Sequence, residues 1–243
     1  MNAIEINGLK KKYSDFTLED ISFSLPEGSI LGLVGENGAG KSTTINLIMN
    51  AVSRDGGTVT VLGTDNRSEE FKKTKEDIGI VLDEAYFPPV ISPVNVNSIM
   101  KYTYQNWDEH KFFGYLKKFA LPEKKKFKDF SRGMKMKLAI AAALSHDPRL
   151  LILDEATSGL DPIIRDEILD IFKEFAAKEN HSILLSSHIV SDLEKLCDYI
   201  AFIHAGKLVF CEKKEVVLDK YALSEHTTLE DIIVFLAKGE RLG

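Results

Sequence analysis

The sequence has few cysteines and lacks long apolar runs, and both features limit the classes of protein to which it can belong. Only two cysteines, Cys197 and Cys211, occur in 243 residues, and both lie in apolar-rich segments. This usage favours thiols in a reduced core over a disulfide-stabilised secreted domain. No apolar run reaches the roughly 18 residues that a helix needs to span a bilayer, so the sequence predicts no membrane-spanning helix.

The N-terminus also lacks the features of a secretory signal. Met-Asn-Ala-Ile-Glu-Ile has neither a basic start nor the apolar stretch that follows it in such signals. We therefore expect a cytosolic chain that would have to dock on another protein to work at a membrane. With 44% apolar and 28% charged residues and no visible repeat, the composition suits one globular domain or a core with an inserted lobe.

A surplus of positive charge is missing as well. The formal net charge is −6, which argues against a general nucleic-acid-binding protein, and we expect no nucleic-acid partner. The charge is uneven, because residues 101–137 contain eleven Lys or Arg and only four acidic residues. Two interpretations of this basic segment are open. It is either a lysine-rich face exposed to solvent, or a surface that faces phosphate, a membrane or an acidic partner.

What the sequence does contain is a phosphate-binding loop. Residues 35–43 fit the pattern G-x-x-x-x-G-K-[ST] and lie between an apolar run at 29–34, typical of a buried strand, and a helical segment at 43–51. Glycines allow successive backbone N–H groups to surround a phosphate, and the helix N-terminus adds partial positive charge. The predicted nucleotide-binding residues of the loop are Gly35, Glu36, Asn37, Gly38, Ala39, Gly40, Lys41, Ser42 and Thr43.

Four side chains are expected to do the chemistry around this loop. Lys41 should reach the β- and γ-phosphates, and the Ser42 hydroxyl should bind Mg²⁺. The apolar run 150–153 is followed by Asp154 and Glu155. Because a buried parallel strand delivers its carboxyl end to the ligand crevice, Asp154 can hold Mg²⁺ through water. Glu155 can orient or deprotonate an attacking water.

The order of the predicted elements indicates an α/β fold in a single domain. Residues 1–30 alternate apolar and polar, typical of antiparallel strands, with turns expected at Asn7-Gly8 and at 26–28, and a further strand of this antiparallel β subdomain lies at 56–63. Later strands alternate with helices, which predicts a P-loop core with a mostly parallel sheet flanked by helices.

The middle and the end of the chain are expected to add to this core. A helical, basic segment at 84–145 interrupts the alternation and is interpreted as an inserted α-helical subdomain, in which prolines keep 86–93 irregular. Residues 215–243 form a C-terminal tail. The expected strands of the core are 78–82, 150–153, 183–187, 200–203 and 208–211, and the expected helices are 94–119, 135–144, 166–177 and 190–197.

Three more motifs complete the pattern. Residues 130–134 read Phe-Ser-Arg-Gly-Met, residues 156–162 read Ala-Thr-Ser-Gly-Leu-Asp-Pro, and the strand at 183–187 ends in Ser-Ser before His188. Together with the phosphate loop and the Leu-Leu-Ile-Leu-Asp-Glu run, this order resembles the ATP-binding cassette family of transporter nucleotide-binding subunits. The resemblance extends over nearly the whole chain and depends on the combination of motifs.

The resemblance implies a role for each matching residue, with ATP as substrate and Mg²⁺ as metal. Tyr13 matches the aromatic side chain that stacks on adenine, although an exposed strand tyrosine is the alternative. Glu155 matches the catalytic base, and His188 matches the switch histidine that touches the γ-phosphate, so the implied catalytic residues are Glu155, His188 and Lys41. The residues that match the signature, which closes on ATP bound to a second subunit, are Ser131, Arg132 and Gly133.

Two departures from the family pattern affect these expectations. The usual signature is Leu-Ser-Gly-Gly-Gln, and the Phe-Ser-Arg-Gly-Met of this chain resembles a subset of bacterial exporters. The family also places a glutamine where this chain has Asp83-Glu84. Asp83 can offer an oxygen to Mg²⁺, but it lacks an amide donor and adds negative charge. The predicted metal ligands are Ser42, Asp83 and Asp154.

The leading interpretation is an ATPase subunit that powers a membrane transporter, with an exporter favoured by the signature and by residues 228–233. It implies a head-to-tail dimer with a second ATPase subunit, a separately encoded transmembrane permease, and a position on the cytoplasmic face of the cell membrane. One alternative is a small-molecule kinase or soluble P-loop switch, which would lack the motifs at 131–133 and 158–161. The other is a non-transport cassette ATPase acting on nucleic acid or ribosomes, which would carry long coiled coils or a second cassette.

Overall fold

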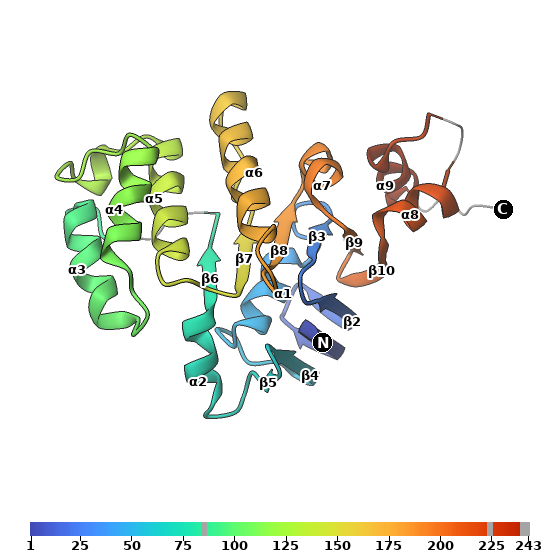
Figure 1. The fold of residues 1–243 in the computed structure, drawn as a ribbon. Coiled ribbons are helices and arrows are strands. Elements are labelled where there is room, and N and C mark those ends of the chain that lie inside the picture. The colour runs from blue at the N-terminus through green and yellow to red at the C-terminus, as the bar shows by residue number, and fades with distance from the viewer. Residues whose placement is uncertain (84–86, 223–225, 239–243) are drawn as a thin grey trace.

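Two β-sheets and the helices around them make up the protein in its computed structural model, which describes residues 1–83, 87–222 and 226–238 (Figure 1). Predictions that named Glu84, Tyr86 or the last residues of the C-terminal tail lie outside this described part. The helices α3, α4 and α5, which lie within residues 93–144, form a group at one end of the larger sheet (Figure 1). We call them the helical group. The helices α8 and α9, within residues 214–237, lie at the opposite end.

The larger sheet has six strands in the order β10-β9-β3-β8-β7-β6. All neighbours from β9 to β6 are parallel, and β10 pairs antiparallel with β9. Every residue of β3, β7 and β8 is buried, as a parallel sheet covered on both faces requires. The α/β prediction is therefore confirmed. The strands are β3 (Ile30–Val34), β6 (Ile78–Val81), β7 (Leu150–Asp154), β8 (Ser182–Ser187), β9 (Tyr199–His204) and β10 (Lys207–Lys213).

A smaller antiparallel sheet in the order β2-β1-β4-β5 forms the N-terminal part, also as predicted. The turn expected at Asn7-Gly8 is wrong, because both residues lie inside β1. Gly8 has a φ of 60°, and the pairing of β1 with β2 shifts register between Ile6 and Leu9. An Asn-Gly pair suits a β-bulge as well as a turn, since both use positive φ. The strands are β1 (Asn2–Lys12), β2 (Thr17–Pro26), β4 (Gly56–Val61) and β5 (Thr64–Asp65).

The single helix expected at 94–119 is two helices, α3 and α4. Tyr104 leaves the helical conformation, and the Asp108 carboxylate accepts a hydrogen bond from the backbone N–H of Lys111 to begin α4. No helix of the described residues is long and apolar enough to cross a membrane. The helices are α1 (Lys41–Ile48), α2 (Phe71–Thr74), α3 (Pro93–Thr103), α4 (Glu109–Lys118), α5 (Arg132–Leu144), α6 (Pro162–Ala176), α7 (Val190–Leu196), α8 (Lys214–Lys220) and α9 (Leu229–Ala237).

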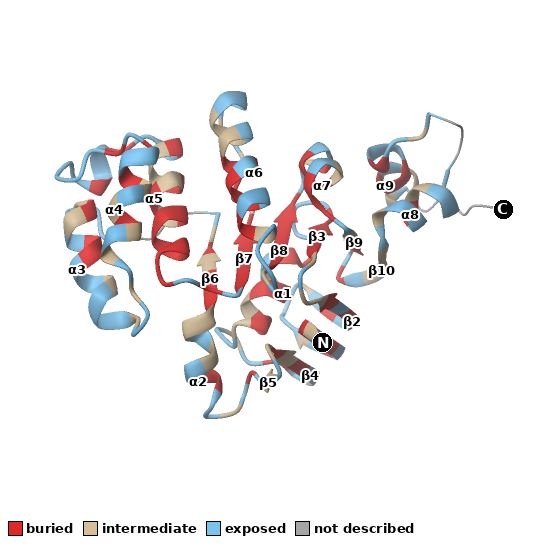
Figure 2. Cartoon of the chain, viewed as in Figure 1, coloured by how far each residue is buried: buried red, intermediate tan, exposed pale blue. Residues whose placement is uncertain are grey.

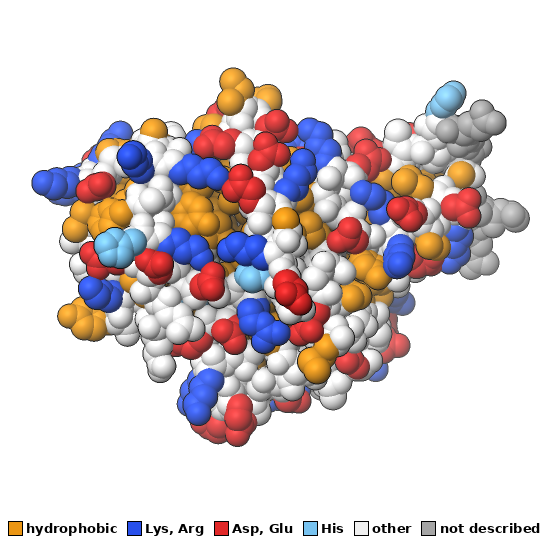
Figure 3. Space-filling model, in the orientation of Figure 1, with side chains coloured by type: hydrophobic (Ala, Val, Ile, Leu, Met, Phe, Trp, Pro, Cys, Tyr) orange, Lys and Arg blue, Asp and Glu red, His pale blue; other side chains and the backbone are white. Residues whose placement is uncertain are grey.

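The basic segment is partly neutralised by acids of the same chain. Lys118 and Lys137 of the α3–α5 group pair with Glu174 and Glu167 of α6, at 2.9 and 2.7 Å. Figure 3 shows basic and acidic side chains interleaved where α5 faces α6. These pairs connect the helical group to α6. Whether the group is a separate subdomain stays a prediction.

Both cysteines are free, as expected for a reduced core. Cys197 is buried, and Cys211 of β10 is partly buried. Burial raises the pKa of both thiols, to about 11 for Cys211. The thiols are therefore protonated near neutral pH and are poor nucleophiles.

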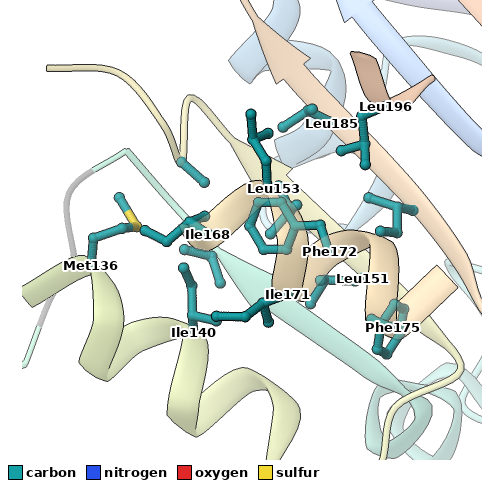
Figure 4. Packing of buried hydrophobic residues seen from close by; sticks show 14 of the residues in the cluster. Met136, Ile140, Leu151, Leu153, Ile168, Ile171, Phe172, Phe175, Leu185 and Leu196 are labelled. Atoms are coloured by element: carbon teal, nitrogen blue, oxygen red, sulfur yellow. The ribbon is translucent and has the colours of Figure 1, made fainter. Parts of the chain in front are cut away.

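Side-chain alternation along the buried strands divides the core into two layers. In β7, Leu151 and Leu153 face α5 and α6, whereas Leu150 and Ile152 face α1 and the antiparallel sheet. Figure 2 shows the central strands buried along their length and α6 buried along one side. Figure 4 shows Phe172 of α6 beside Leu151 and Leu153.

The packing between α6 and the larger sheet predicts that Phe172 contributes strongly to the free energy of unfolding. Phe172 is fully buried (0% exposed), so Phe172→Ala removes packed apolar volume and should lower the free energy of unfolding by about 3–5 kcal/mol. Tyr102→Ala is the matched control, because Tyr102 is 93% exposed and its truncation should change stability by less than about 0.5 kcal/mol. Urea denaturation measures both, and equal losses would contradict this packing.

Candidate functional site

The phosphate-binding loop connects the end of β3 to the start of α1. Gly40 precedes α1 with a φ of 114°, and a Cβ there would lie 2.7 Å from the Leu18 side chain, so only glycine fits. The helix begins at Lys41, two residues earlier than expected, because the chain enters helical geometry directly after this glycine. The N-terminus of α1 therefore points its free backbone N–H groups and positive dipole end into the loop.

Lys41 is buried, and its ammonium group already has oxygen partners. Nζ donates to the backbone oxygens of Gly35 at 2.8 Å and Glu36 at 3.2 Å, and it lies 3.3 Å from Oε1 of Glu155. The Lys41 ammonium group thus contacts both the phosphate-binding loop and the residue that follows β7, which are far apart in sequence.

The end of β7 is held in place by β8. Asp154 is aligned with Ser186 in the parallel ladder, and the Ser186 hydroxyl donates to Oδ1 of Asp154 at 2.5 Å. The backbone N–H of Glu155 donates to the Ser186 backbone oxygen at 3.1 Å. The sequence does not reveal this role of Ser186, because only the register of β7 and β8 brings the two residues into contact.

Glu155 is in contact with both predicted catalytic partners. Its backbone has a φ of 51°, a conformation that non-glycine residues adopt rarely and that clusters at functional sites. Oε2 accepts a hydrogen bond from Nδ1 of His188 at 2.6 Å, since an ionised carboxylate can only accept. Lys41, Glu155 and His188 therefore form one continuous chain of contacts.

Lys41 and Glu155 line a cavity of about 610 Å³, a volume suited to a small-molecule ligand. His188 and Asp154 are not among its lining residues, and His188 is connected to the cavity through its contact with Glu155. Tyr13 lines this cavity with 40% of its surface exposed, and Nζ of Lys11 lies over the Tyr13 ring, 5.5 Å from its centre. Asp15 and Phe16 also line the cavity, and the sequence did not indicate this. Phe16 fits the alternating apolar pattern of a strand and so gave no separate signal. The full lining is Tyr13, Asp15, Phe16, Asn37, Gly38, Gly40, Lys41, Ser42, Thr43, Asp83 and Glu155.

The predicted signature residues are absent from this lining. Ser131 caps α5 by accepting a hydrogen bond from the Met134 backbone N–H at 3.3 Å. Arg132 pairs with a residue of the lining, because its Nη2 lies 3.1 Å from Oδ1 of Asp83. Arg132 also lies against Gly159, where a Cβ would be 2.5 Å from Nη1. The two departures from the family pattern, Asp83 and Arg132, are thus partners of each other.

The carboxylates that could hold a metal are few. No group of three or more His, Cys, Asp or Glu side chains suited to a metal occurs among the described residues. The predicted ligands, Ser42, Asp83 and Asp154, offer the hard oxygens that Mg²⁺ prefers. Because Mg²⁺ is commonly held by one or two carboxylates together with substrate phosphates, this set fits a metal that binds with a nucleotide.

Comparisons with known proteins agree with this geometry. A family model described as ABC transporter matches residues 18–158, more than half of the chain. The chain belongs to the ABC transporter family. A lantibiotic transport ATP-binding protein of Streptococcus pyogenes is 36% identical over 85% of this chain and 89% of its own length. A linearmycin resistance ATP-binding protein of Bacillus subtilis is 38% identical over 85% of this chain and 68% of its own.

Solved structures agree as well. One described as the ATP-binding subunit of an ABC transporter has a TM-score of 0.86 and 26% identity, covering 96% of this chain and 99% of that one. A dimeric ATP-binding cassette bound to ADP and Pi has a TM-score of 0.77 at 21% identity, covers 86% of this chain and 98% of its own, and shows the shared fold. The chain is an ATP-binding ABC ATPase, which removes the kinase interpretation.

Lys41 gives the first test of this ABC site. Lys41→Ala removes the one cationic side chain of residues 35–43. If Lys41 reaches the phosphates as predicted, the rate of ATP hydrolysis should fall at least about 100-fold and ATP should bind more weakly. Lys72→Ala is the control, because Lys72 is exposed on α2. This variant should hydrolyse ATP at the wild-type rate. Wild-type hydrolysis by the Lys41 variant would show that the phosphate loop is misassigned.

The Asp83–Arg132 pair gives the second test. Asp83→Gln removes a negative charge from the cavity and restores an amide donor, so the basal rate of ATP hydrolysis should rise. ATP affinity should change by less than about fivefold, because both side chains are half exposed and such pairs contribute about 1 kcal/mol or less. Asp129→Asn, an exposed acid of the helical group, controls for charge removal alone. An unchanged rate in Asp83→Gln would exclude an influence of position 83 on turnover.

Proposed function

We propose that this chain is the ATP-hydrolysing subunit of a membrane exporter and that Glu155, His188 and Lys41 are its catalytic residues. The observation that carries the assignment of roles is the chain of contacts that runs from Lys41 and Glu155, which line the cavity, to His188 behind Glu155. These three side chains come from three different segments and meet where a phosphate held by the loop would lie.

Binding of ATP would use both ends of the cavity. Tyr13 would stack on the adenine ring, and the backbone N–H groups of 35–43 with Lys41 would surround the phosphates. Lys41 and Glu155 are in contact, so phosphate oxygens compete with the Glu155 carboxylate for the lysine ammonium. We infer that binding of the triphosphate frees Glu155 for its catalytic role.

Ser42, Asp154 and Asp83 would hold Mg²⁺, which supplies charge neutralisation to the phosphates when bound. Asp154 is buried, with one carboxylate oxygen fixed by Ser186, so its position is well defined. Asp83 is half exposed and shared with Arg132, so it is the weaker candidate of the three.

Hydrolysis would follow from the position of Glu155. Its carboxylate takes a proton from a water molecule that attacks the γ-phosphate, and the water oxygen forms the new bond as the bond to ADP breaks. His188 donates from Nδ1 to the same carboxylate and so orients it. A proton on Nε2 as well would let the ring donate to the γ-phosphate. Lys41 stabilises the charge that spreads over the phosphate oxygens.

Each ATP would be enclosed between two subunits. Ser131 and Gly133 lie outside the lining of the cavity in their own chain, which supports a head-to-tail dimer in which the partner supplies them. The relatives are named as transport or resistance proteins for lantibiotics, bacitracin and linearmycin, which supports export of an antibiotic compound. A separate permease subunit would hold the dimer at the cytoplasmic face of the cell membrane.

Glu155→Gln tests these roles directly. Glutamine keeps the shape of the side chain but cannot take a proton, so ATP should bind normally and be hydrolysed at least about 100-fold more slowly. The variant should elute as a dimer in size-exclusion chromatography with Mg-ATP and as a monomer with ADP. Glu179→Gln, an exposed glutamate after α6, should behave as wild type. Normal turnover in Glu155→Gln, with a loss in Asp154→Asn, would transfer the role of base to another residue, of which His188 is the first to test.

A further inference from the structure

We infer that Asp192, Thr157 and Arg165 form a positioning network that holds Glu155 and His188 in their catalytic arrangement. The inference rests on the proposed roles of Glu155 and His188. None of the three network residues lines the nucleotide cavity, so they would act through the catalytic pair and not on ATP itself.

Asp192 is the centre of the network. It lies on α7, is 1% exposed, and has both carboxylate oxygens engaged. Oδ2 accepts a hydrogen bond from the Thr157 hydroxyl at 2.7 Å, and Oδ1 accepts one from Nε of Arg165 at 2.7 Å. A buried carboxylate is costly without a countercharge, and Arg165 places its guanidinium against Oδ1 of Asp192.

The network repeats the connection made by the catalytic pair. Glu155 contacts His188, and a few residues further along the same two segments Thr157 contacts Asp192. Two contacts between the same segments fix their relative orientation, which a single contact leaves free to rotate. Glu155 depends on such support, because its positive φ is unfavourable and persists only where the surroundings impose it.

Arg165 extends the network across the loop at 158–161. Thr157 precedes this loop and Arg165 lies in the first turn of α6 after it, so Asp192 binds both ends of the loop. The Arg165 Nη2 group also donates to the Ser191 hydroxyl at 3.0 Å. The loop at 158–161 is thereby fastened at both ends to α7, the helix that follows His188.

The chemistry of the three residues favours positioning over simple stability. Buried ion pairs are weak contributors to stability, and apolar residues of similar volume often serve as well in that respect. A hydroxyl, a carboxylate and a guanidinium instead impose directional contacts on three segments. Catalytic groups must be held within fractions of an ångström, so this directionality suits the place where it occurs.

The test compares Thr157→Val with Thr157→Ser in the full chain. Valine keeps the volume but loses the hydroxyl, so kcat for ATP hydrolysis should fall about tenfold or more while KM changes less than about twofold. Serine restores the hydroxyl and should restore most of kcat. Ser145→Ala is the matched control, because Ser145 also buries a hydroxyl that donates to a backbone oxygen, far from the site.

A second measurement separates positioning from a general loss of structure. In a Glu155→Gln background, Thr157→Val should slow single-turnover hydrolysis less than about twofold further, because the group it positions is already disabled. Equal fold losses in both backgrounds, or an equal loss of kcat in Ser145→Ala, would overturn the inference. So would a normal kcat in Thr157→Val when Glu155→Gln and His188→Ala are both impaired. Normal rates in those two variants would instead overturn the proposed catalytic roles.

Discussion

The parallel pairing of β7 with β8 is the constraint on which the rest of the site depends. It places Asp154 opposite Ser186 and lets Ser186 bind both the Asp154 carboxylate and the Glu155 N–H. The chain segments that leave these strands then bring Glu155 and His188 together. A slip of one residue would turn the side chains to opposite faces and separate them. Since β3 pairs with the other side of β8, the phosphate loop opens at the same edge.

The sequence predicted those parts of the protein that depend on local chemistry. The phosphate-binding loop connects a strand to a helix, and the apolar runs of the core are strands, both as the local patterns predicted. Of the two acids after 150–153, Asp154 ends β7 and Glu155 follows it, and their catalytic roles stay predictions. Interruptions within helical segments were harder to predict from the sequence. The interruption between α3 and α4 depends on the capping by Asp108, which competes with a helical pattern that continues on both sides. Asn7-Gly8 suited a bulge and a turn equally, and only the pairing of β1 decides between them.

Contacts between distant segments could not be predicted from a single sequence. Asp83 and Arg132 were each recognised as departures from the family pattern, but periodicity carries no information on where the helical group lies against the core. The structure brings the two side chains to 3.1 Å, which gives the Asp83 carboxylate a partner other than a metal. The contact of Lys41 with Glu155 and the burial of Asp192 between Thr157 and Arg165 were missed for the same reason.

The central claim is that one catalytic centre is built where the carboxyl ends of β3, β7 and β8 meet. A crystal structure of the chain with ADP, Mg²⁺ and orthovanadate tests it most directly, because vanadate mimics the phosphoryl group in transfer. The account predicts vanadate within hydrogen-bond distance of Lys41 Nζ and the ring of His188, with the Glu155 carboxylate beside its apical oxygen and the adenine against Tyr13. Vanadate bound away from Glu155 and His188, with the phosphate loop filled by ADP alone, would contradict it.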